Sequence, residues 1–231
     1  MASLKNNNPR KAVLYFTKAI EIWPHNSSAY FLRGITHIEM RQYTEAIRDF
    51  NTAEQLNPGG DPSVLQRRGY AYDMLGKKDL AIADYTAAIT IDPGNYYAYA
   101  DRGTIYLNKG YYRQAVQDFL KAIEFYRNFT SVHRNLGCAY FYLGDYDAAK
   151  KEFNIAIDLN PHYHKTYCDR GVLYRTLGLL NLARQDYKRA LQECPHYKYA
   201  QICLEDLERE IAQGAETKQE PHGNSVPVTI Q

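Results

Sequence analysis

The feature that most constrains this chain is a short phrase that recurs at nearly constant spacing. It reads ADRGTIY from Ala100 and CDRGVLY from Cys168, and looser versions occur three more times. Successive glycines of the phrase are 35, 34, 34 and 34 residues apart. These glycines are Gly34, Gly69, Gly103, Gly137 and Gly171. A fixed period of this size indicates a solenoid, in which each unit is one supersecondary element stacked on its neighbours.

The same register extends beyond the glycine and divides each unit into two helices. Alanine stands twelve and nineteen residues after every glycine, and Phe or Tyr stands sixteen residues after it. The first helix is expected from about four residues before the glycine to six after it. A second glycine (Gly76, Gly110, Gly144, Gly178) then supplies the left-handed backbone that ends a helix. Small residues at the phrase glycine and at both alanines allow close helix approach, and the aromatic residues fill the remaining space.

This pattern resembles the tetratricopeptide repeat, over about residues 11–197. Period, order and residue classes all agree with that family. The resemblance implies an all-α fold in which antiparallel helix pairs stack into a right-handed superhelical solenoid. It also implies that a concave face, lined mainly by the first helices, holds a peptide or protein partner.

The two ends depart from the repeat. Ala12, Phe16 and Ala19 match a second helix without its first helix, so the array is expected to open on a half repeat after a short lead, residues 1–10. We expect the apolar face of this helix to be partly exposed and to favour self-association. Five full repeats follow to residue 197, then a polar-faced capping helix over residues 198–213. Residues 214–231 are rich in Gly, Pro, Ser, Thr and Gln and are expected to be a disordered tail.

Charge, hydropathy and cysteine use narrow the class of protein. The formal net charge is only +2, so the protein as a whole has no strong electrostatic attraction to nucleic acid or to an anionic membrane. No apolar run approaches the roughly 18 residues that span a bilayer. The four cysteines form no CxxC pair, which predicts reduced thiols in a cytoplasmic protein.

One charged pattern recurs inside the repeats. Arginine precedes the glycine in four copies, and the same four copies carry aspartate fifteen residues after it. The copy with Leu136 in place of arginine carries Glu152 instead of aspartate. Because the two residues appear together, we expect ion pairs between helices in preference to a charged ligand ladder.

The residue patterns predict neither catalysis nor a bound cofactor or metal. Neither a phosphate-cradling glycine loop nor a GxSxG motif occurs, and the glycines fall at repeat positions. His162, His164 and Cys168 lie close in sequence, but no fourth ligand stands near them, so we expect no metal site.

The groove residues follow from the family's register, at fixed offsets from the phrase glycine. In that register aromatic and charged side chains recur that the packing pattern does not require, and these types supply most binding energy at interfaces. The predicted peptide-binding groove comprises Arg67, Tyr70, Tyr97, Asp101, Arg134, Asn135, Tyr142, Lys165 and Asp169. Their alternating signs favour a protein partner of mixed charge.

Two other kinds of partner remain as alternatives. A chaperone cofactor of this family holds a C-terminal carboxylate with five residues, and the best register here matches only Asn135 and Lys165, with Asp169 in place of an arginine. An RNA-reading helical repeat takes one base per repeat. The acids that interleave the groove would oppose a phosphate backbone.

Overall fold

The protein is described by a computed structural model whose described residues are 8–216. That part of the chain forms twelve α-helices and no strand. The helices are α1 (Pro9–Ile22), α2 (Ser27–Glu39), α3 (Tyr43–Leu56), α4 (Pro62–Met74), α5 (Lys78–Ile91), α6 (Tyr96–Asn108), α7 (Tyr112–Phe125), α8 (Thr130–Leu143), α9 (Tyr146–Leu159), α10 (His164–Thr176), α11 (Leu180–Glu193) and α12 (Lys198–Glu216). The all-α prediction is confirmed.

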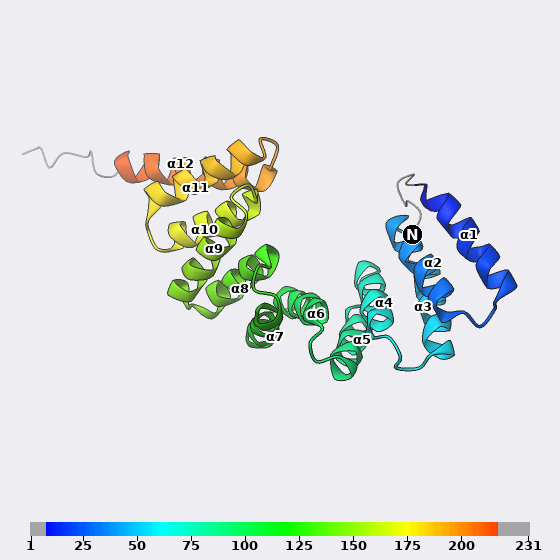
Figure 1. The fold of residues 1–231 in the computed structure, drawn as a ribbon. Coiled ribbons are helices and arrows are strands. Elements are labelled where there is room, and N and C mark those ends of the chain that lie inside the picture. Colours follow the sequence, from blue (N-terminus) through cyan, green and yellow to red (C-terminus); the bar gives the residue numbers. More distant parts are fainter. Residues whose placement is uncertain (1–7, 217–231) are drawn as a thin grey trace, which may run out of the picture. The chain divides into compact units, whose positions relative to one another are not determined.

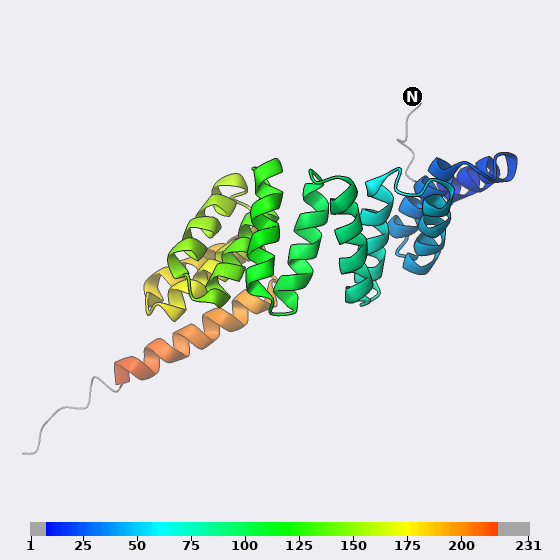
Figure 2. The same cartoon turned by 90° about the horizontal axis from the view of Figure 1, so that it is seen from below.

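The helices fall into two compact units, residues 1–143 and 144–231. In the first unit, α1 to α8 follow one another as antiparallel neighbours, each packed against the next along the chain (Figures 1 and 2). In the second unit, α10 packs on α9 and α11, and α12 covers α11. Within each unit, every helix therefore contacts the helix next to it in sequence, as a solenoid requires.

Local sequence signals set the helix ends. The side chains of Asn26, Asp61 and Asn95 accept hydrogen bonds from backbone amides in the first turns of α2, α4 and α6. These caps place the start of each first helix seven residues before the glycine, three earlier than the sequence pattern predicted. Gly76, Gly110, Gly144 and Gly178 adopt positive φ, as expected. In the first full repeat Arg41 takes the same role with a φ of 58°, a conformation that costs a non-glycine residue energy.

Four of the phrase glycines mark the points where the two helices of a repeat cross. A Cβ atom added at Gly34 would lie 2.6 Å from Cε1 of Phe50, and one at Gly171 would lie 2.6 Å from Cε1 of Tyr187. Gly69 and Gly103 meet Tyr85 and Phe119 in the same way. Each aromatic ring thus occupies the space that a side chain on the opposing helix would need.

The repeat cores are built from the alanine and aromatic registers. In α3, Ala46 and Phe50 have no exposed surface, and the corresponding residues of α5, α7, α9 and α11 are buried to the same degree. α12 contributes Ala200, Cys203 and Leu207 to the last core. It runs to Glu216, three residues past the predicted boundary, and the remainder of the predicted tail lies outside the described residues. None of the described helices is both long and apolar enough to cross a membrane.

Candidate partner-binding face

Side-chain hydrogen bonds link the first helices of neighbouring repeats in the first unit, and two predicted groove residues, Asp101 and Asn135, take part in them. Gln66 of α4 donates from Nε2 to Oδ2 of Asp101 on α6 at 2.8 Å. Asn135 of α8 donates from Nδ2 to Oγ1 of Thr104 on α6 at 3.2 Å. These bonds join α4, α6 and α8 through side chains of the predicted register. Gln66, Asp101, Thr104 and Asn135 therefore lie on one face.

Asp101 lies in the most unusual electrostatic environment of this face. The pKa of its carboxyl group is raised to about 6, chiefly by burial, and the nearby Asp73 acts in the same direction. The hydrogen bond from Gln66 and the charge of Arg67 act in the opposite direction on this pKa. Burial also raises the pKa of the Tyr85 hydroxyl, to which Asp101 contributes. Asp73 is held in an ion pair with Lys78. The centre of the face is thus a polar cluster with limited access to water.

Aromatic side chains flank this polar cluster. Tyr70 meets Tyr43 edge to face, with ring centroids 6.5 Å apart. Tyr142 stacks on Tyr112 at 4.8 Å and is 59% exposed. Both predicted tyrosines are thus braced by a ring from a second helix, which limits the entropy that either loses when a partner binds.

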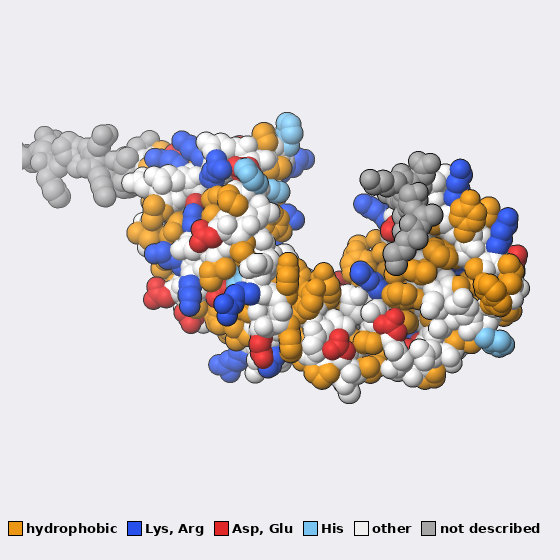
Figure 3. Space-filling model, in the orientation of Figure 1, with side chains coloured by type: hydrophobic (Ala, Val, Ile, Leu, Met, Phe, Trp, Pro, Cys, Tyr) orange, Lys and Arg blue, Asp and Glu red, His pale blue; other side chains and the backbone are white. Residues whose placement is uncertain are grey.

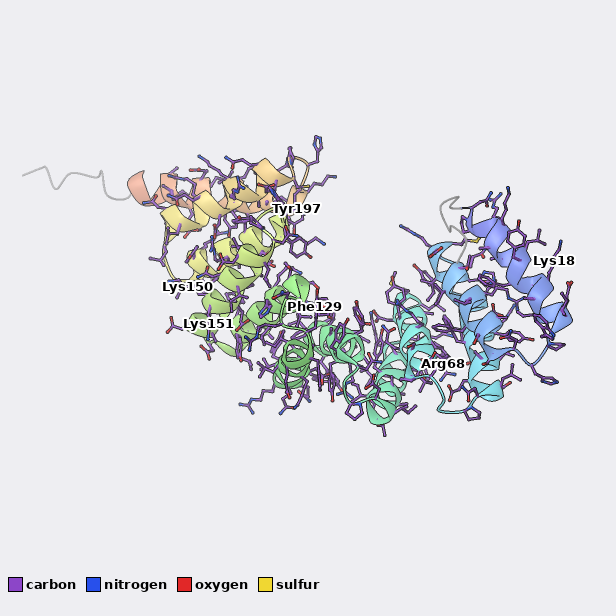
Figure 4. All side chains as sticks on the ribbon, in the orientation of Figure 1. Lys18, Arg68, Phe129, Lys150, Lys151 and Tyr197 are labelled. Atoms are coloured by element: carbon purple, nitrogen blue, oxygen red, sulfur yellow. The ribbon has the colours of Figure 1, made fainter. Side chains whose placement is uncertain are left out.

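Tyr97 belongs to a larger group of rings, which we call the aromatic cluster: Tyr96, Tyr97, Tyr126 and Phe129. Tyr96 stacks on Tyr126 at 5.2 Å, and Tyr97 meets Phe129 edge to face at 5.9 Å. Tyr97 and Tyr126 are 50% and 45% exposed. Figure 3 shows hydrophobic side chains gathered over this part of the first unit, and Figure 4 labels Phe129 at the start of α8.

The sequence pattern identified only Tyr97 of this cluster. A comparison of equivalent positions among the repeats finds the others. Phe129 stands at the helix N-cap, where α2, α4 and α6 carry Asn26, Asp61 and Asn95. Tyr126 stands where two other repeats carry Asn57 and Asp92. Polar residues therefore occupy both positions in several repeats, whereas α10 again carries an aromatic residue, Tyr163, at its N-cap.

Lys165 and Asp169 lie on α10, in the second unit. Lys165 is exposed, and Asp169 is half-buried and adds to the raised pKa of the Tyr199 hydroxyl, which burial chiefly causes. In the same unit Arg175 donates from Nε to Oε2 of Glu210 at 2.8 Å, which ties α10 to α12. Arg134 of the first unit donates to Asn135 at 3.2 Å. Arg67 is exposed and lies near Asp101.

The repeated arginine and aspartate form the expected ion pairs. In each of the four repeats the guanidinium donates two bonds to one carboxylate, at distances between 2.6 and 2.8 Å. The pairs are Arg33–Asp49, Arg68–Asp84, Arg102–Asp118 and Arg170–Asp186. Figure 4 marks Arg68 between helices of the first unit. The hydrogen bond to Asp84 raises the pKa of Arg68, and the aspartates are buried. These charges hold helices together and are not offered to a ligand.

The histidines near Cys168 have other partners. His162 binds Oε2 of Glu193 through Nδ1 at 2.9 Å, and the ring of His164 meets Tyr197 at 4.7 Å (Tyr197 is labelled in Figure 4). Cys168 is buried in the last core. In the part of the chain that the structure describes, no group of three metal-ligating side chains comes together.

Comparison with known families gives a consistent result. Four models described as tetratricopeptide repeat match residues 27–59, 62–95, 96–129 and 134–198. Human tetratricopeptide repeat protein 6 is 33% identical over 106 residues, which are 46% of this chain and 20% of that protein. The meiotically up-regulated gene 93 protein of Schizosaccharomyces pombe is 38% identical over 64 residues, which are 28% of this chain and 16% of that protein. The chain therefore spans at most about a fifth of the length of these two curated relatives.

Solved structures share the fold at low sequence identity. The APC/C hetero-tetramer Cut9-Hcn1 superposes with a TM-score of 0.76 at 21% identity, over 87% of this chain and 40% of that one. YrrB, a TPR protein with an unusual peptide-binding site, superposes with a TM-score of 0.67 at 19% identity, over 80% of this chain and 95% of that one. These likenesses show the fold alone. With the family matches along most of its length, they establish that the chain belongs to the tetratricopeptide repeat family.

Proposed function

We propose that the protein is a non-catalytic interaction scaffold that binds a peptide or helical segment of a protein partner on the face formed by α4, α6 and α8. The observation that carries this proposal is the aromatic cluster beside the polar centre at Asp101. Two of its rings, Tyr126 and Phe129, stand where several other repeats have polar turn residues, and Tyr97 and Tyr126 are about half exposed. Exposed aromatic rings that the fold does not need are a common basis of binding hot spots.

The side chains on this face indicate which kind of partner segment would bind there. The exposed Arg67 and the half-buried Asp101 offer one charge of each sign, and the half-buried Asn135 offers an amide group. The rings of the aromatic cluster offer apolar area with hydroxyl groups at its edge. A segment with an apolar or aromatic anchor and mixed charges on either side fits this arrangement. Family membership supports the same class of function, since repeats of this kind serve as scaffolds for other proteins.

Residues of the second unit extend the proposal. Lys165 and Asp169 occupy the same family register on α10 as the groove residues of the first unit. We propose them as partner-contacting residues of the second unit in their own right, and we propose that the protein acts in the cytoplasm with partners that are proteins. No cofactor is required for this function.

The test compares tyrosine variants in quantitative affinity capture from cell lysate. Tyr97→Ala combined with Tyr126→Ala is expected to lose most captured partners, because each truncated hot-spot side chain costs about 2 kcal/mol or more. Tyr111→Ala is the matched control, since Tyr111 is 48% exposed but lies outside the aromatic cluster. Both variants should keep the helical circular dichroism of the parent. Equal recovery of the same partners by all three proteins would reject the proposal.

A further inference from the structure

Asp101 of α6 carries a half-buried charge that the described chain compensates only in part. Its Oδ2 atom accepts a hydrogen bond from the neutral amide of Gln66. Its Oδ1 atom has no hydrogen-bond partner among the described residues and is not sealed from solvent. Arg67 is near enough to lower the pKa of this carboxyl group, yet within the described chain it forms no ion pair with it. One oxygen of Asp101 is therefore still able to accept a hydrogen bond.

Other aspartates in comparable surroundings do have a cationic partner. The four aspartates of the interhelical ion pairs are buried, and each meets the guanidinium of an arginine. Asp73, the acidic neighbour of Asp101, is paired with Lys78. A carboxylate withdrawn from water needs such a partner, because its desolvation is otherwise uncompensated. Asp101 is the exception among these six aspartates.

The repeat does not require a carboxylate at this position. The residues of the other full repeats that also stand two before the phrase glycine are Leu32, Arg67, Asn135 and Asp169. Apolar, basic, amide and acidic side chains are therefore all compatible with the packing of a first helix. The charge of Asp101 serves no contact that the architecture needs, and a partly desolvated charge on a binding face is a candidate recognition group.

Asp101 also lies on the same side of α6 as Tyr97 of the aromatic cluster. Residues four apart are neighbours on a helix surface and are about 6 Å apart along its axis. Tyr97 is 50% exposed, so both side chains can be reached from solvent. In an extended peptide, side chains two residues apart point to the same side and are about 6.6 Å apart. One extended segment can therefore contact Tyr97 with one side chain and Asp101 with another.

We propose that Asp101 is a specificity-determining residue that receives an arginine side chain of the partner segment, two positions from the apolar side chain that contacts the aromatic cluster. The arginine donates to Oδ1, while Gln66 keeps its bond to Oδ2. Arginine fits this place better than lysine, because its charge is more weakly hydrated and is less costly to bring into a half-buried site. This inference rests on the proposed function and adds the chemistry of one contact to it.

The probe is a phage-displayed library of random peptides, offered to the full chain. Peptides that also bind the Tyr97→Ala/Tyr126→Ala variant are removed, so that only those that need the aromatic cluster are kept. The kept peptides are expected to be enriched in arginine two positions from an aromatic or large apolar residue. The strongest of them is then synthesised with arginine and with citrulline, which has nearly the same shape but no charge. In fluorescence polarisation the citrulline peptide should bind about tenfold more weakly or worse.

Two variants of the protein locate the contact. Asp101→Asn, which can still accept from Gln66, should bind the arginine and citrulline peptides equally. Asp79→Asn removes the same formal charge from a side chain of α5 that is 88% exposed, and it should keep the preference of the parent for arginine.

The outcomes separate this inference from the proposed function. Peptides that need the aromatic cluster but show no enrichment in arginine would overturn the inference and leave the proposed function standing. The same holds if the penalty for citrulline persists in Asp101→Asn. Recovery of no peptide that needs the cluster would overturn both.

Discussion

At the scale of single residues, four ion pairs fix how the helices of a repeat meet. Arg68 is bidentate to Asp84, and in side-chain terms the two are only 17% and 10% exposed. Because both side chains are largely shielded from water, the removal of one partner leaves the other charge buried without a compensating charge. By contrast, Lys121 and Glu124 pair on the surface with 53% and 58% exposure, where solvent screens the interaction.

A double-mutant cycle should separate these two kinds of pair. For Arg68→Ala and Asp84→Ala, the coupling free energy of unfolding is expected to be about 0.5–3 kcal/mol. For Lys121→Ala and Glu124→Ala it should be near zero. The measurement is chemical denaturation of the four proteins of each cycle. Additive losses at Arg68 and Asp84 would mean that the bidentate contact contributes nothing specific to folding.

Asp101 should make stability depend on pH in a defined window. Its pKa is about 6 in the folded chain, against an ordinary value of 3.8, so the native state holds the proton at pH values where the unfolded state has lost it. The stabilising contribution is fully present below pH 4 and is lost as the pH rises through 6. Asp101→Asn, whose amide oxygen still accepts from Gln66, should remove this change. Between pH 4 and pH 7 the parent should therefore lose on the order of 2 kcal/mol of unfolding free energy that the variant keeps.

The measurement is the free energy of unfolding of parent and variant from pH 4 to pH 8. Other carboxylates titrate in both proteins, so only the difference between them reports Asp101. Two parallel curves would show that Asp101 ionises normally in the folded chain.

At the scale of helices, the crossing points are the least tolerant positions. A Cβ at Gly103 would lie 2.9 Å from Cε1 of Phe119 and 3.1 Å from Cβ of Asp118. Gly103→Leu must therefore separate α6 from α7 or displace the ring, at a cost of about 1–3 kcal/mol or more. Asn108→Leu, at an exposed position of the same helix, should change the thermal midpoint little. A midpoint that Gly103→Leu leaves unchanged would contradict close packing at the crossing.

The last helix stabilises the array by covering its final core. Leu207 of α12 is fully buried among Cys168, Tyr187 and Ala200. Leu207→Ala should cost about 2–5 kcal/mol through lost burial and the cavity left behind. Ile202→Ala is the control, because Ile202 lies on the same helix and is 54% exposed. If the two variants unfold at the same denaturant concentration, α12 does not act as the predicted cap.

At the scale of the whole molecule, the sequence repeat was enough to predict most of the fold. It predicted little of the candidate partner-binding face. Gly34 and Phe50 occupy registers that recur, and a recurring register can be read from one sequence. Tyr126 and Phe129 lie in a turn between repeats, where the equivalent residues differ from repeat to repeat, so no recurring register marks them. The environment of Asp101 includes side chains of α4, among them Gln66, 35 residues away, and no local pattern contains that information.

Because each repeat contacts only its neighbours, local stability should follow the contacts that each helix has. α1 packs on α2 alone among the described helices and has no fully buried residue, whereas α6 packs on both α5 and α7 and buries Ala98, Ala100, Gly103 and Ile105. Native-state amide hydrogen exchange should therefore show α1 opening with the lowest free energy and α6 with a markedly higher one. Equal protection of α1 and α6 in the protein alone would mean that the chain opens in a single global step, and that the half repeat is not the weak end of the array.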